Sequence, residues 1–295
     1  MPSSTNNLEE YLRSQNLIVE KELRRLLPEP KGLDQSVCEA MRYSVFAGGQ
    51  RIRPILLLAA NELCGGETAD ALPAACAMEM IHTYSLIHDD LPAMDNGQLR
   101  RGKPTTHRKF GEAIALLAGD ALLTLAFEVL CLCPERVVAK LVHELARAAG
   151  TMGMVGGQVA DIEWAGKEME FPTLEYIHSH KTGALITAAV RMGAIIGGAD
   201  EATLKSLTGY GHCLGLAFQI SDDIIDVESD SSITGKDSGT DAALSKATYP
   251  RFFGVAESRR RCLSLGGQAK EYLEDFGTRA EILKSIADLV GNRKA

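Results

Sequence analysis

Apolar residues recur every three to four positions along most of the chain. Between residues 8 and 27 they stand at helical spacing among Glu, Lys and Arg, which is typical of an amphipathic helix with one buried face. The same spacing predicts helices over residues 35–47, 55–64, 69–91, 113–131, 134–150, 173–196, 202–227, 258–276 and 279–290. No run of β-branched and aromatic residues stands between Asn-Gly or Asp-Gly turns, so a sheet is not expected. The pattern predicts an all-α fold.

Three stretches interrupt this helical pattern. Residues 48–54 form a short basic turn, residues 94–110 are polar and strongly basic, and residues 228–249 are rich in Ser, Asp, Gly and Thr. A polar loop as long as the third is usually a functional lid or disordered. None of the three resembles a linker between domains, because the apolar faces on either side need partners across it. We therefore expect one domain over residues 1–295, a single large helical bundle.

The composition excludes several classes of protein. The chain has 295 residues, of which 45% are hydrophobic, so a disordered chain is excluded. Lys and Arg number 31 against 39 Asp and Glu, a net charge of −8, which argues against a nucleic-acid partner. The most apolar stretch, residues 113–133, is interrupted by Asp120 and Glu128, so we expect a buried helix there and no membrane span.

The cysteines and the N-terminal segment predict where the protein works. The seven cysteines are odd in number and include no C-x-x-C pair, which favours reduced thiols in a reducing compartment. The first fifteen residues are polar, with neither the apolar core of a secretion signal nor an Arg-rich transit pattern. We therefore expect a cytoplasmic protein.

A first group of polar residues lies near the end of the fourth predicted helix. At 3.6 residues per turn, His82, Ser85 and Asp89 share one face of that helix. The helix dipole disfavours adjacent Asp89 and Asp90 at a C-terminus by a few tenths to about 1 kcal/mol. A divalent cation would offset this cost, and Asp95 can fold back from the following turn. Carboxylates suit Mg²⁺, which is usually held by one or two of them together with substrate phosphates.

A second acidic group lies near the end of the helix predicted over residues 202–227. Its spacing places Asp222, Asp223 and Asp226 on neighbouring positions of one face, with Gln219 one turn earlier. Like charges at this spacing destabilise a bare helix, and buried carboxylates either shift their pKa or bind a cation. Two such groups on two helices predict a shared cation site.

Basic residues accompany both acidic groups. Arginine forks match phosphate oxygens in pairs, and lysine supplies a point charge. Together with the carboxylates they favour a ligand that is anionic and bridged by metal ions, and a diphosphate satisfies both conditions. The residues concerned are Arg51 and Arg53, Arg100 and Arg101, Lys181 beside Thr182, and Lys236 and Lys246 in the long polar loop.

Nine motifs in fixed order resemble those of the trans-isoprenyl diphosphate synthases, or polyprenyl synthetases, and among these most closely the bacterial farnesyl diphosphate synthases. The resemblance runs from about residue 30 to the end. The motifs are GGQRIRP (48–54), LIHDDLPAMD (86–95), LRRGKPT (99–105), FGE (110–112), LAGD (117–120), GGQ (156–158), KTG (181–183), FQISDDIID (218–226) and KATYP (246–250).

The resemblance implies an isoprenoid synthase fold, in which helices surround a central cavity and the two Asp groups face each other across it. It also implies a homodimer. The implied reaction is the Mg²⁺-dependent head-to-tail condensation of isopentenyl diphosphate with dimethylallyl and then geranyl diphosphate, which gives farnesyl diphosphate.

The resemblance also assigns roles to single residues. The implied Mg²⁺ ligands are Asp89, Asp95 and Asp222, with Asp90, Asp223 and Asp226 in supporting catalytic roles. The implied allylic diphosphate site consists of Arg100, Lys181, Thr182, Gln219, Lys236 and Lys246. The implied isopentenyl diphosphate site consists of Gln50, Arg53, His82 and Arg101. Because the cationic intermediate must be kept from water, the long polar loop (residues 228–249) and the C-terminal Arg293 and Lys294 are also expected to close over the site.

The sequence departs from the family pattern at two places. Position 50 is usually Lys in this family and here is Gln50, which removes one cation from the isopentenyl diphosphate site. The residues after Asp95 are often acidic in bacterial members and here read Asn-Gly-Gln. We expect weaker isopentenyl diphosphate binding from the first change.

Four alternatives remain. A geranylgeranyl diphosphate synthase would share every motif and differ in tunnel depth. A terpene cyclase needs no isopentenyl diphosphate site, so the turn at residues 48–54 counts against it. A non-catalytic subunit could lose the second Asp group, which is intact here. A di-iron carboxylate bundle would use Glu-x-x-His strings, and two occur, at Glu79 with His82 and at Glu175 with His178.

Tyr84 is the residue that we expect to limit product length, with Ser85 beside it. It precedes Asp89 by five positions, which is about one and a half helical turns deeper in the implied cavity. We predict that Tyr84→Ala opens the tunnel and yields products longer than fifteen carbons, measured by chromatography of the dephosphorylated products. A variant that still stops at farnesyl diphosphate would show that the floor lies elsewhere.

Overall fold

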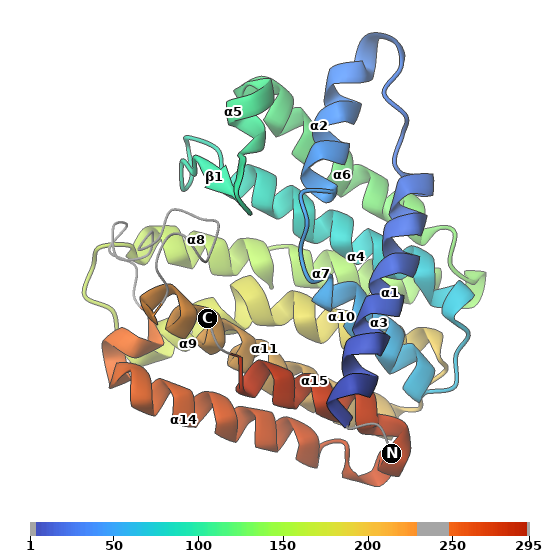
Figure 1. Ribbon diagram of the computed structural model, residues 1–295, viewed down its shortest axis with the longest axis vertical. Coiled ribbons are helices and arrows are strands. Elements are labelled where there is room, and N and C mark those ends of the chain that lie inside the picture. Colours follow the sequence, from blue (N-terminus) through green and yellow to red (C-terminus); the bar gives the residue numbers. More distant parts are fainter. Residues whose placement is uncertain (1–3, 229–247, 294–295) are drawn as a thin grey trace.

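The computed structural model describes residues 4–228 and 248–293, and helices dominate this part of the chain (Figure 1). The longer helices are α1 (Ser4–Leu26), α2 (Gln35–Val45), α3 (Ile52–Leu63), α4 (Thr68–Asp89), α6 (Glu112–Leu130), α7 (Glu135–Ala149), α8 (Met154–Trp164), α10 (Ala184–Ile196), α11 (Glu201–Glu228), α14 (Tyr249–Glu271) and α15 (Glu281–Gly291). Shorter helical segments are η1 (Gly32–Asp34), α5 (Thr106–Phe110), α9 (Phe171–Ile177), η2 (His178–Gly183) and η3 (Glu274–Ala280). The predicted all-α fold is confirmed.

Helices α3, α4 and α10 form the centre of the bundle. All of α3 except Glu62 is buried, and Ile55 to Leu58 are fully inaccessible to solvent. A helix that is apolar on all sides is stable only when other helices surround it. Helix α3 packs against α10 and α4, and α10 packs in turn against α11 and α7. Pro54 lies in the first turn of α3, where its missing N–H costs no helical hydrogen bond.

The outer helices cover this centre and complete one connected cluster of buried apolar side chains. The cluster draws on both ends of the described chain, from Leu8 and Val19 in α1 to Ile286 and Val290 in α15. Helices α1 and α15 touch each other, and α14 packs along α11 (Figure 1).

Helix α6 packs against α4 with a face of small residues that includes Ala115, Ala118 and Gly119. Of the helices in the described part of the chain, α6 alone is long and apolar enough to cross a membrane, and 39% of its most apolar window is buried. Leu116 and Leu117 on its outer face are 47% and 52% exposed. The expected helix is therefore present, but it is buried on one face only.

The helix predicted over residues 173–196 is interrupted by a π-helical segment, η2, between α9 and α10. The spacing of apolar residues does not reveal this interruption, because a single wider turn changes the direction of the side chains only over a few residues. Such segments are rare and often occur at functional sites. This one contains Lys181 and Thr182, which the resemblance assigned to diphosphate binding.

A two-stranded hairpin corrects the expectation that strands are absent. Strands β1 (Leu99–Arg100) and β2 (Lys103–Pro104) pair antiparallel across a two-residue turn. The φ angles of Arg101 and Gly102 in this turn are 55° and 73°. Two positive φ angles define the type I′ turn, which usually carries Asn-Gly or Asp-Gly. The sequence analysis did not predict this turn, because an arginine occupies the position where Asn or Asp is typical.

One whole helix and the start of another also differ from expectation. Helix α8 was not predicted, since Gly153, Gly156 and Gly157 at its start resemble a loop. Helix α14 begins at Tyr249 rather than at residue 258, with a break at Gly254, whose φ is 76°. The predicted helix starts after this break, because glycine at a left-handed position ends the regular pattern.

We predict that Gly193→Ala destabilises the protein. A Cβ at this position of α10 would overlap the backbone carbonyl of Leu57 in α3, so the two central helices would have to separate. Overpacking of this kind costs about 1–3 kcal/mol. Urea unfolding followed by circular dichroism measures the change in unfolding free energy.

Gly267→Ala is the matched control for this prediction. Gly267 lies within α14, and a Cβ there would meet nothing within 4 Å. Alanine should therefore stabilise the helix by about 0.5–1 kcal/mol. Equal effects of the two substitutions would contradict close packing of α3 and α10 at Gly193.

Candidate functional site

The first acidic group lies where α4 ends. Asp89 is the last residue of α4, and Asp90 caps it. The chain then turns back, and the backbone N–H of Asp95 donates to the backbone carbonyl of Asp89 at 2.9 Å. This hydrogen bond brings Asp95 next to Asp89 in space. The predicted fold-back of Asp95 onto the helix end is confirmed.

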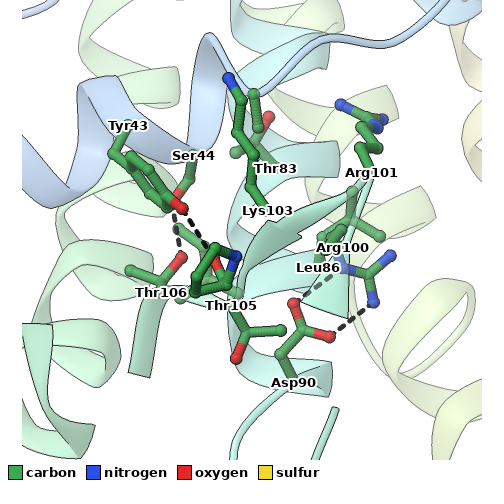
Figure 2. A pocket seen from close by; sticks show the side chains of 13 residues that line it. Tyr43, Ser44, Thr83, Leu86, Asp90, Arg100, Arg101, Lys103, Thr105 and Thr106 are labelled. Carbon is green, nitrogen blue, oxygen red and sulfur yellow. Dashed lines mark hydrogen bonds and ion pairs between the residues drawn. The ribbon is translucent and has the colours of Figure 1, made fainter. Parts of the chain in front are cut away.

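Asp90 is bound by the hairpin rather than exposed beside Asp89. Arg100 of β1 donates two hydrogen bonds to it, from Nε to Oδ2 and from Nη2 to Oδ1, both at 2.7 Å (Figure 2). Asp90 is 4% exposed, so this charge-assisted pair is largely shielded from water. A small pocket beside the pair is lined by residues of α2, α4 and the hairpin. No residue of α11 lines it, so it is distinct from the implied cavity between the two acidic groups.

Arginines converge on the turn between α2 and α3. The Arg101 guanidinium donates through Nη1 to the carbonyl of Gly48 and lies so close to Gly49 that a Cβ there would overlap it. Arg53, in the first turn of α3, is 8% exposed, and its Nε has no hydrogen-bond partner. Within the described residues, neither Arg53 nor Arg101 forms an ion pair with a carboxylate. This arrangement suits the binding of an anion.

The electrostatics of this cluster favour an anion. Burial lowers the pKa of Arg53, and the carboxylates of Glu79 and Asp222 partly restore it. The Arg101 pKa is likewise lowered by burial and by the other arginines. Burial and the nearby positive charges of Arg53 and Arg101 hold the pKa of His82 well below its usual value. His82 is thus neutral and can donate one hydrogen bond to an anion while adding no further charge.

Lys181 in the π-helical segment is held by α8. Its Nζ donates to Oδ2 of Asp161 at 2.6 Å, and both side chains are mostly shielded from solvent. Gly157 lies one turn before Asp161 on the same face of α8, and a Cβ there would overlap the backbone nitrogen of Lys181. The missing side chain lets α8 approach, which brings Asp161 within reach of Lys181.

Hydrogen bonds connect the second acidic group to the π-helical segment η2. Thr182 donates to Gln219 at 2.6 Å, and Gln219 donates to Oδ1 of Asp223 at 2.9 Å. The backbone N–H of Tyr249 donates to Oδ2 of Asp223, which is 2% exposed and lies 3.5 Å from Nε2 of His178. Asp223 therefore points into the protein and fixes the start of α14. This hydrogen-bonded chain joins three helical segments.

Asp222 and Asp226 lie on the more accessible side of α11, where both are partly exposed. Arg293 donates to Oδ1 of Asp222 at 2.7 Å, and its guanidinium carbon lies 5.2 Å from the centre of the Phe218 ring. The C-terminal end of the described chain thus reaches the second acidic group. Arg293 was expected near the site. Lys294 and residues 229–247 of the long polar loop, the other parts of the expected closure, lie outside the described residues.

The carboxylates at this site fit a divalent cation only together with a second ligand. In residues 4–228 and 248–293, no three His, Cys, Asp or Glu side chains lie close enough to hold a metal. Mg²⁺ commonly binds to one or two carboxylates plus the phosphates of a substrate, so a complete protein cage is not required. Asp89 and Asp95, which are joined by the turn, are oxygen donors of the right kind.

The remaining predicted residues divide into four cases. Tyr84 is 7% exposed, and burial together with Asp89 raises its pKa, so its ring lies inside the bundle below the acidic group. The Ser85 hydroxyl donates to the backbone carbonyl of His82 within α4. Gln50 is exposed in the turn. Lys236 and Lys246 lie outside the described residues, so their assignment to the allylic diphosphate stays a prediction.

The sequence analysis did not assign three residues to this arrangement. Asp161 was missed because α8 was not predicted, although Asp161 follows Gly157 at helical spacing. Glu79 and His178 were noticed only as parts of possible iron ligands. Instead, Glu79 binds Arg51 at 2.6 Å, and His178 lies beside Asp223.

Comparison with known proteins agrees with this geometry. The family model described as polyprenyl synthetase matches residues 34–283. The chain is 47% identical to a geranylgeranyl diphosphate synthase from Cyanophora paradoxa over 298 residues, which covers 99% of both chains. It is 46% identical to a farnesyl diphosphate synthase from Geobacillus stearothermophilus over 292 residues, covering 97% of this chain and 98% of that one.

A solved structure is also similar over nearly the whole chain. It is the geranyltransferase from Helicobacter pylori in complex with magnesium and isoprenyl diphosphate, with a TM-score of 0.85 and 32% identity. The match covers 97% of this chain and 96% of that one.

Proposed function

We propose a specific reaction for this chain, which belongs to the polyprenyl synthetase family. It has the isoprenoid synthase fold and is a trans-prenyl diphosphate synthase, that is, a prenyltransferase. We propose that it is a farnesyl diphosphate synthase. It would condense isopentenyl diphosphate first with dimethylallyl diphosphate and then with geranyl diphosphate.

The observation that carries this product assignment is the buried ring of Tyr84. It packs edge-on against His88, with ring centres 5.7 Å apart, and lies close enough to Asp89 for that carboxylate to raise its pKa. A chain growing inward from a diphosphate at Asp89 would meet this ring, which supports a stop at fifteen carbons. The alternative product is geranylgeranyl diphosphate, which is favoured by the similarity to the Cyanophora enzyme.

Isopentenyl diphosphate is assigned to the arginine cluster. Arg53 and Arg101 carry charges that no described carboxylate pairs, and neutral His82 between them can donate to a phosphate oxygen. A diphosphate would supply the missing negative charge. Gln50 at the exposed rim adds a hydrogen-bond donor where a lysine would add a charge, so binding is expected to be weaker than in a relative with lysine.

The allylic diphosphate is assigned to the space between the two acidic groups. Lys181, held by Asp161, and Arg100, held by Asp90, are oriented cations for it. Thr182 and Gln219 are hydrogen-bonded to each other at 2.6 Å and would contribute polar contacts. We propose Mg²⁺ as the cofactor, held by Asp89, Asp95 and Asp222 together with the diphosphate. When bound, it would neutralise the charge of the leaving group.

The reaction follows from these contacts. The C–O bond to the allylic diphosphate breaks, and its electron pair leaves with the diphosphate, whose growing charge Lys181 and Arg100 stabilise. The alkene of isopentenyl diphosphate, oriented by Arg53 and Arg101, supplies the electrons of the new C–C bond. A proton then leaves the neighbouring carbon, and the released diphosphate accepts it. The apolar side chains around Tyr84 would keep water from the cationic carbon.

We predict that the purified full chain converts isopentenyl and dimethylallyl diphosphates mainly to the fifteen-carbon product when Mg²⁺ is present. Because Asp89 and Asp95 supply only part of the metal shell, EDTA should abolish turnover reversibly. Chromatography of the products against fifteen- and twenty-carbon standards is the measurement. A twenty-carbon main product would establish the alternative, and no condensation at all would refute the assignment.

We also propose a homodimer formed through the outer face of α6. Leu116 and Leu117 on this face are 47% and 52% exposed, and Leu132 just beyond the helix is 57% exposed. Such a group of apolar side chains on a helix of this hydropathy is costly in water. A second copy of the chain, packed through the same face, would bury it with twofold symmetry.

We predict that Leu117→Glu weakens this dimer at least about tenfold, since the substitution places a charge inside an apolar interface. Light scattering after size-exclusion chromatography, over a range of concentrations, gives the dissociation constant. Leu33→Glu is the control, because Leu33 is fully exposed in η1, away from α6. A monomeric wild type, or an unchanged dimer in the Leu117 variant, would contradict the proposal.

Two further proposals concern location and organisation. All seven cysteines are free thiols, which supports a cytoplasmic protein. The connected apolar cluster, which runs from α1 to α15, supports a single domain. Fractionation of the source cells and limited proteolysis of the purified chain would test these two proposals.

A further inference from the structure

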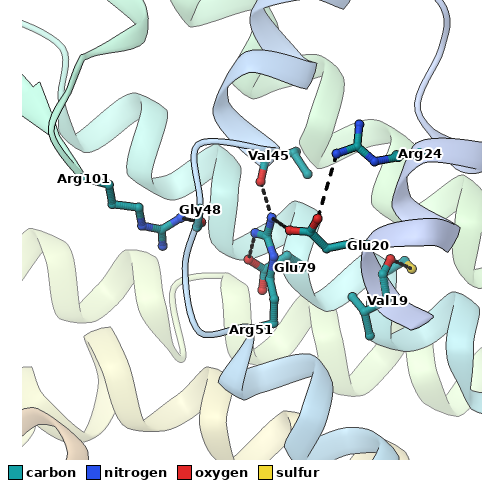
Figure 3. Close-up of polar contacts among 9 residues, drawn as sticks. Val19, Glu20, Arg24, Val45, Gly48, Arg51, Glu79 and Arg101 are labelled. Carbon is teal, nitrogen blue, oxygen red and sulfur yellow. Dashed lines mark hydrogen bonds and ion pairs between the residues drawn. The ribbon is translucent and has the colours of Figure 1, made fainter. Parts of the chain in front are cut away.

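The Arg51 side chain is buried in a network of its own beneath the arginine cluster. Its side chain is 0% exposed, and its Nη1 donates to Oε1 of Glu79 at 2.6 Å (Figure 3). Its Nη2 donates to Oε1 of Glu20 at 3.2 Å and to the backbone carbonyl of Val45. Glu79 is itself 2% exposed. This network joins α1, the end of α2, the turn before α3, and α4.

The turn that Arg51 belongs to has an unfavourable backbone. Gly48 and Gly49 have φ angles of 107° and 124°, and Arg51 itself has a φ of 51°. A left-handed conformation is costly for a residue with a side chain and persists only where other contacts enforce it. The two carboxylates and the carbonyl that bind the Arg51 guanidinium are such contacts. On the opposite side, Arg101 holds the same turn through the carbonyl of Gly48.

Glu79 couples this turn to the helix that carries the first acidic group. It lies in α4, three residues before His82, so the two side chains lie on neighbouring positions of one face. Arg53 follows Arg51 by two residues, at the start of α3. One ion pair therefore sets the spacing between the helix that carries His82 and the turn that presents Gln50 and Arg53.

The charge of Glu79 also acts on the ligand-binding arginines directly. It raises the pKa of both Arg53 and Arg101 against the effect of burial. Without this carboxylate, the Arg51 charge would remain buried beside Arg53, Arg101 and His82 with only Glu20 to balance it. Repulsion would then move Arg53 and Arg101 apart, because an unbalanced buried charge is strongly disfavoured.

We propose that Arg51 and Glu79 are positioning residues for the isopentenyl diphosphate site, holding the turn at residues 48–51 and α4 at the spacing that binds this substrate. The inference rests on the proposed function and deepens it, since neither residue needs to touch the substrate. Arg51 points away from Arg101, toward Glu20 of α1 and Glu79 of α4 (Figure 3). The Glu79-x-x-His82 string thus has a role that requires no metal.

The test is Glu79→Gln in the full chain, which keeps the shape of the side chain and removes its charge. We expect the KM for isopentenyl diphosphate to rise about 10- to 100-fold, because displacement of binding groups by about 1 Å has effects of this size. Because the allylic site uses other residues, kcat and the KM for dimethylallyl diphosphate should stay within about twofold of wild type. Steady-state kinetics with each substrate varied in turn separate these constants.

Glu144→Gln is the matched control. Arg191 of α10 binds Glu144 of α7 through two hydrogen bonds of 2.8 and 2.6 Å, an ion pair between two helices that touches none of the site residues. Its loss should leave both KM values unchanged. Arg51→Lys should behave like Glu79→Gln, because a single ammonium group cannot bridge Glu79, Glu20 and the Val45 carbonyl. A wild-type KM for isopentenyl diphosphate in Arg51→Lys would show that the branched guanidinium of Arg51 is not needed.

A third variant keeps the test decisive if Glu79→Gln fails to fold. Glu20→Gln removes the weaker partner at the partly exposed end of the network, where the Glu20 side chain is 33% exposed. It should raise the same KM by a smaller factor and leave the circular dichroism spectrum unchanged. A folded Glu79 or Glu20 variant with wild-type KM for isopentenyl diphosphate would overturn the inference. A wild type that condenses no prenyl diphosphates would refute the proposed function instead, and the two failures are distinguishable.

Discussion

The balance of buried charge around the end of α4 is the constraint on which the site depends. Four arginines lie near His82, and like charges in a shielded place repel each other strongly. Glu79 and Glu20 bind Arg51, and Asp90 binds Arg100, so two of the four have carboxylate partners inside the protein. Of the other two, Arg101 donates to the backbone carbonyl of Gly48, and Arg53 is buried in the first turn of α3. Neither of these two forms an ion pair with a carboxylate of the described residues, which suits the binding of an anionic ligand.

On the opposite side of the site, close contact between the backbones of α8 and the π-helical segment, rather than a balance of charge, positions the polar groups. Gly157 lets α8 lie against the backbone of the π-helical segment, so that Asp161 reaches Lys181. The chain from Thr182 through Gln219 to Asp223 then fixes this segment to α11 and to the start of α14. The described groups that we assign to the allylic diphosphate are therefore each held by a partner behind them. Such support reduces the entropy lost when the substrate binds.

Much of the fold and of the site could be predicted from the sequence. Apolar spacing located nearly all long helices, and the Asp pairs near residues 89 and 222 marked two helix ends because like charges at that spacing need an explanation. Three features escaped prediction. The hairpin was missed because Arg101 adopts a left-handed conformation that propensity assigns to Asn or Gly. Helix α8 was missed because its glycines serve packing, and η2 because a single wider turn leaves the apolar pattern intact.

The sequence by itself determined most of the long helices, the candidate site residues and the resemblance to the family, since all three depend on short-range spacing and short motifs. Only the tertiary structure decided which carboxylate serves which cation. Asp90 binds Arg100 rather than standing beside Asp89, Glu79 binds Arg51 from 28 positions away, and Arg293 reaches Asp222 from 71 positions away. The physical reason is that helical periodicity fixes the face on which a side chain lies. The packing of α3, α4, α8 and α11 fixes which faces meet, and ion pairs form only where they do.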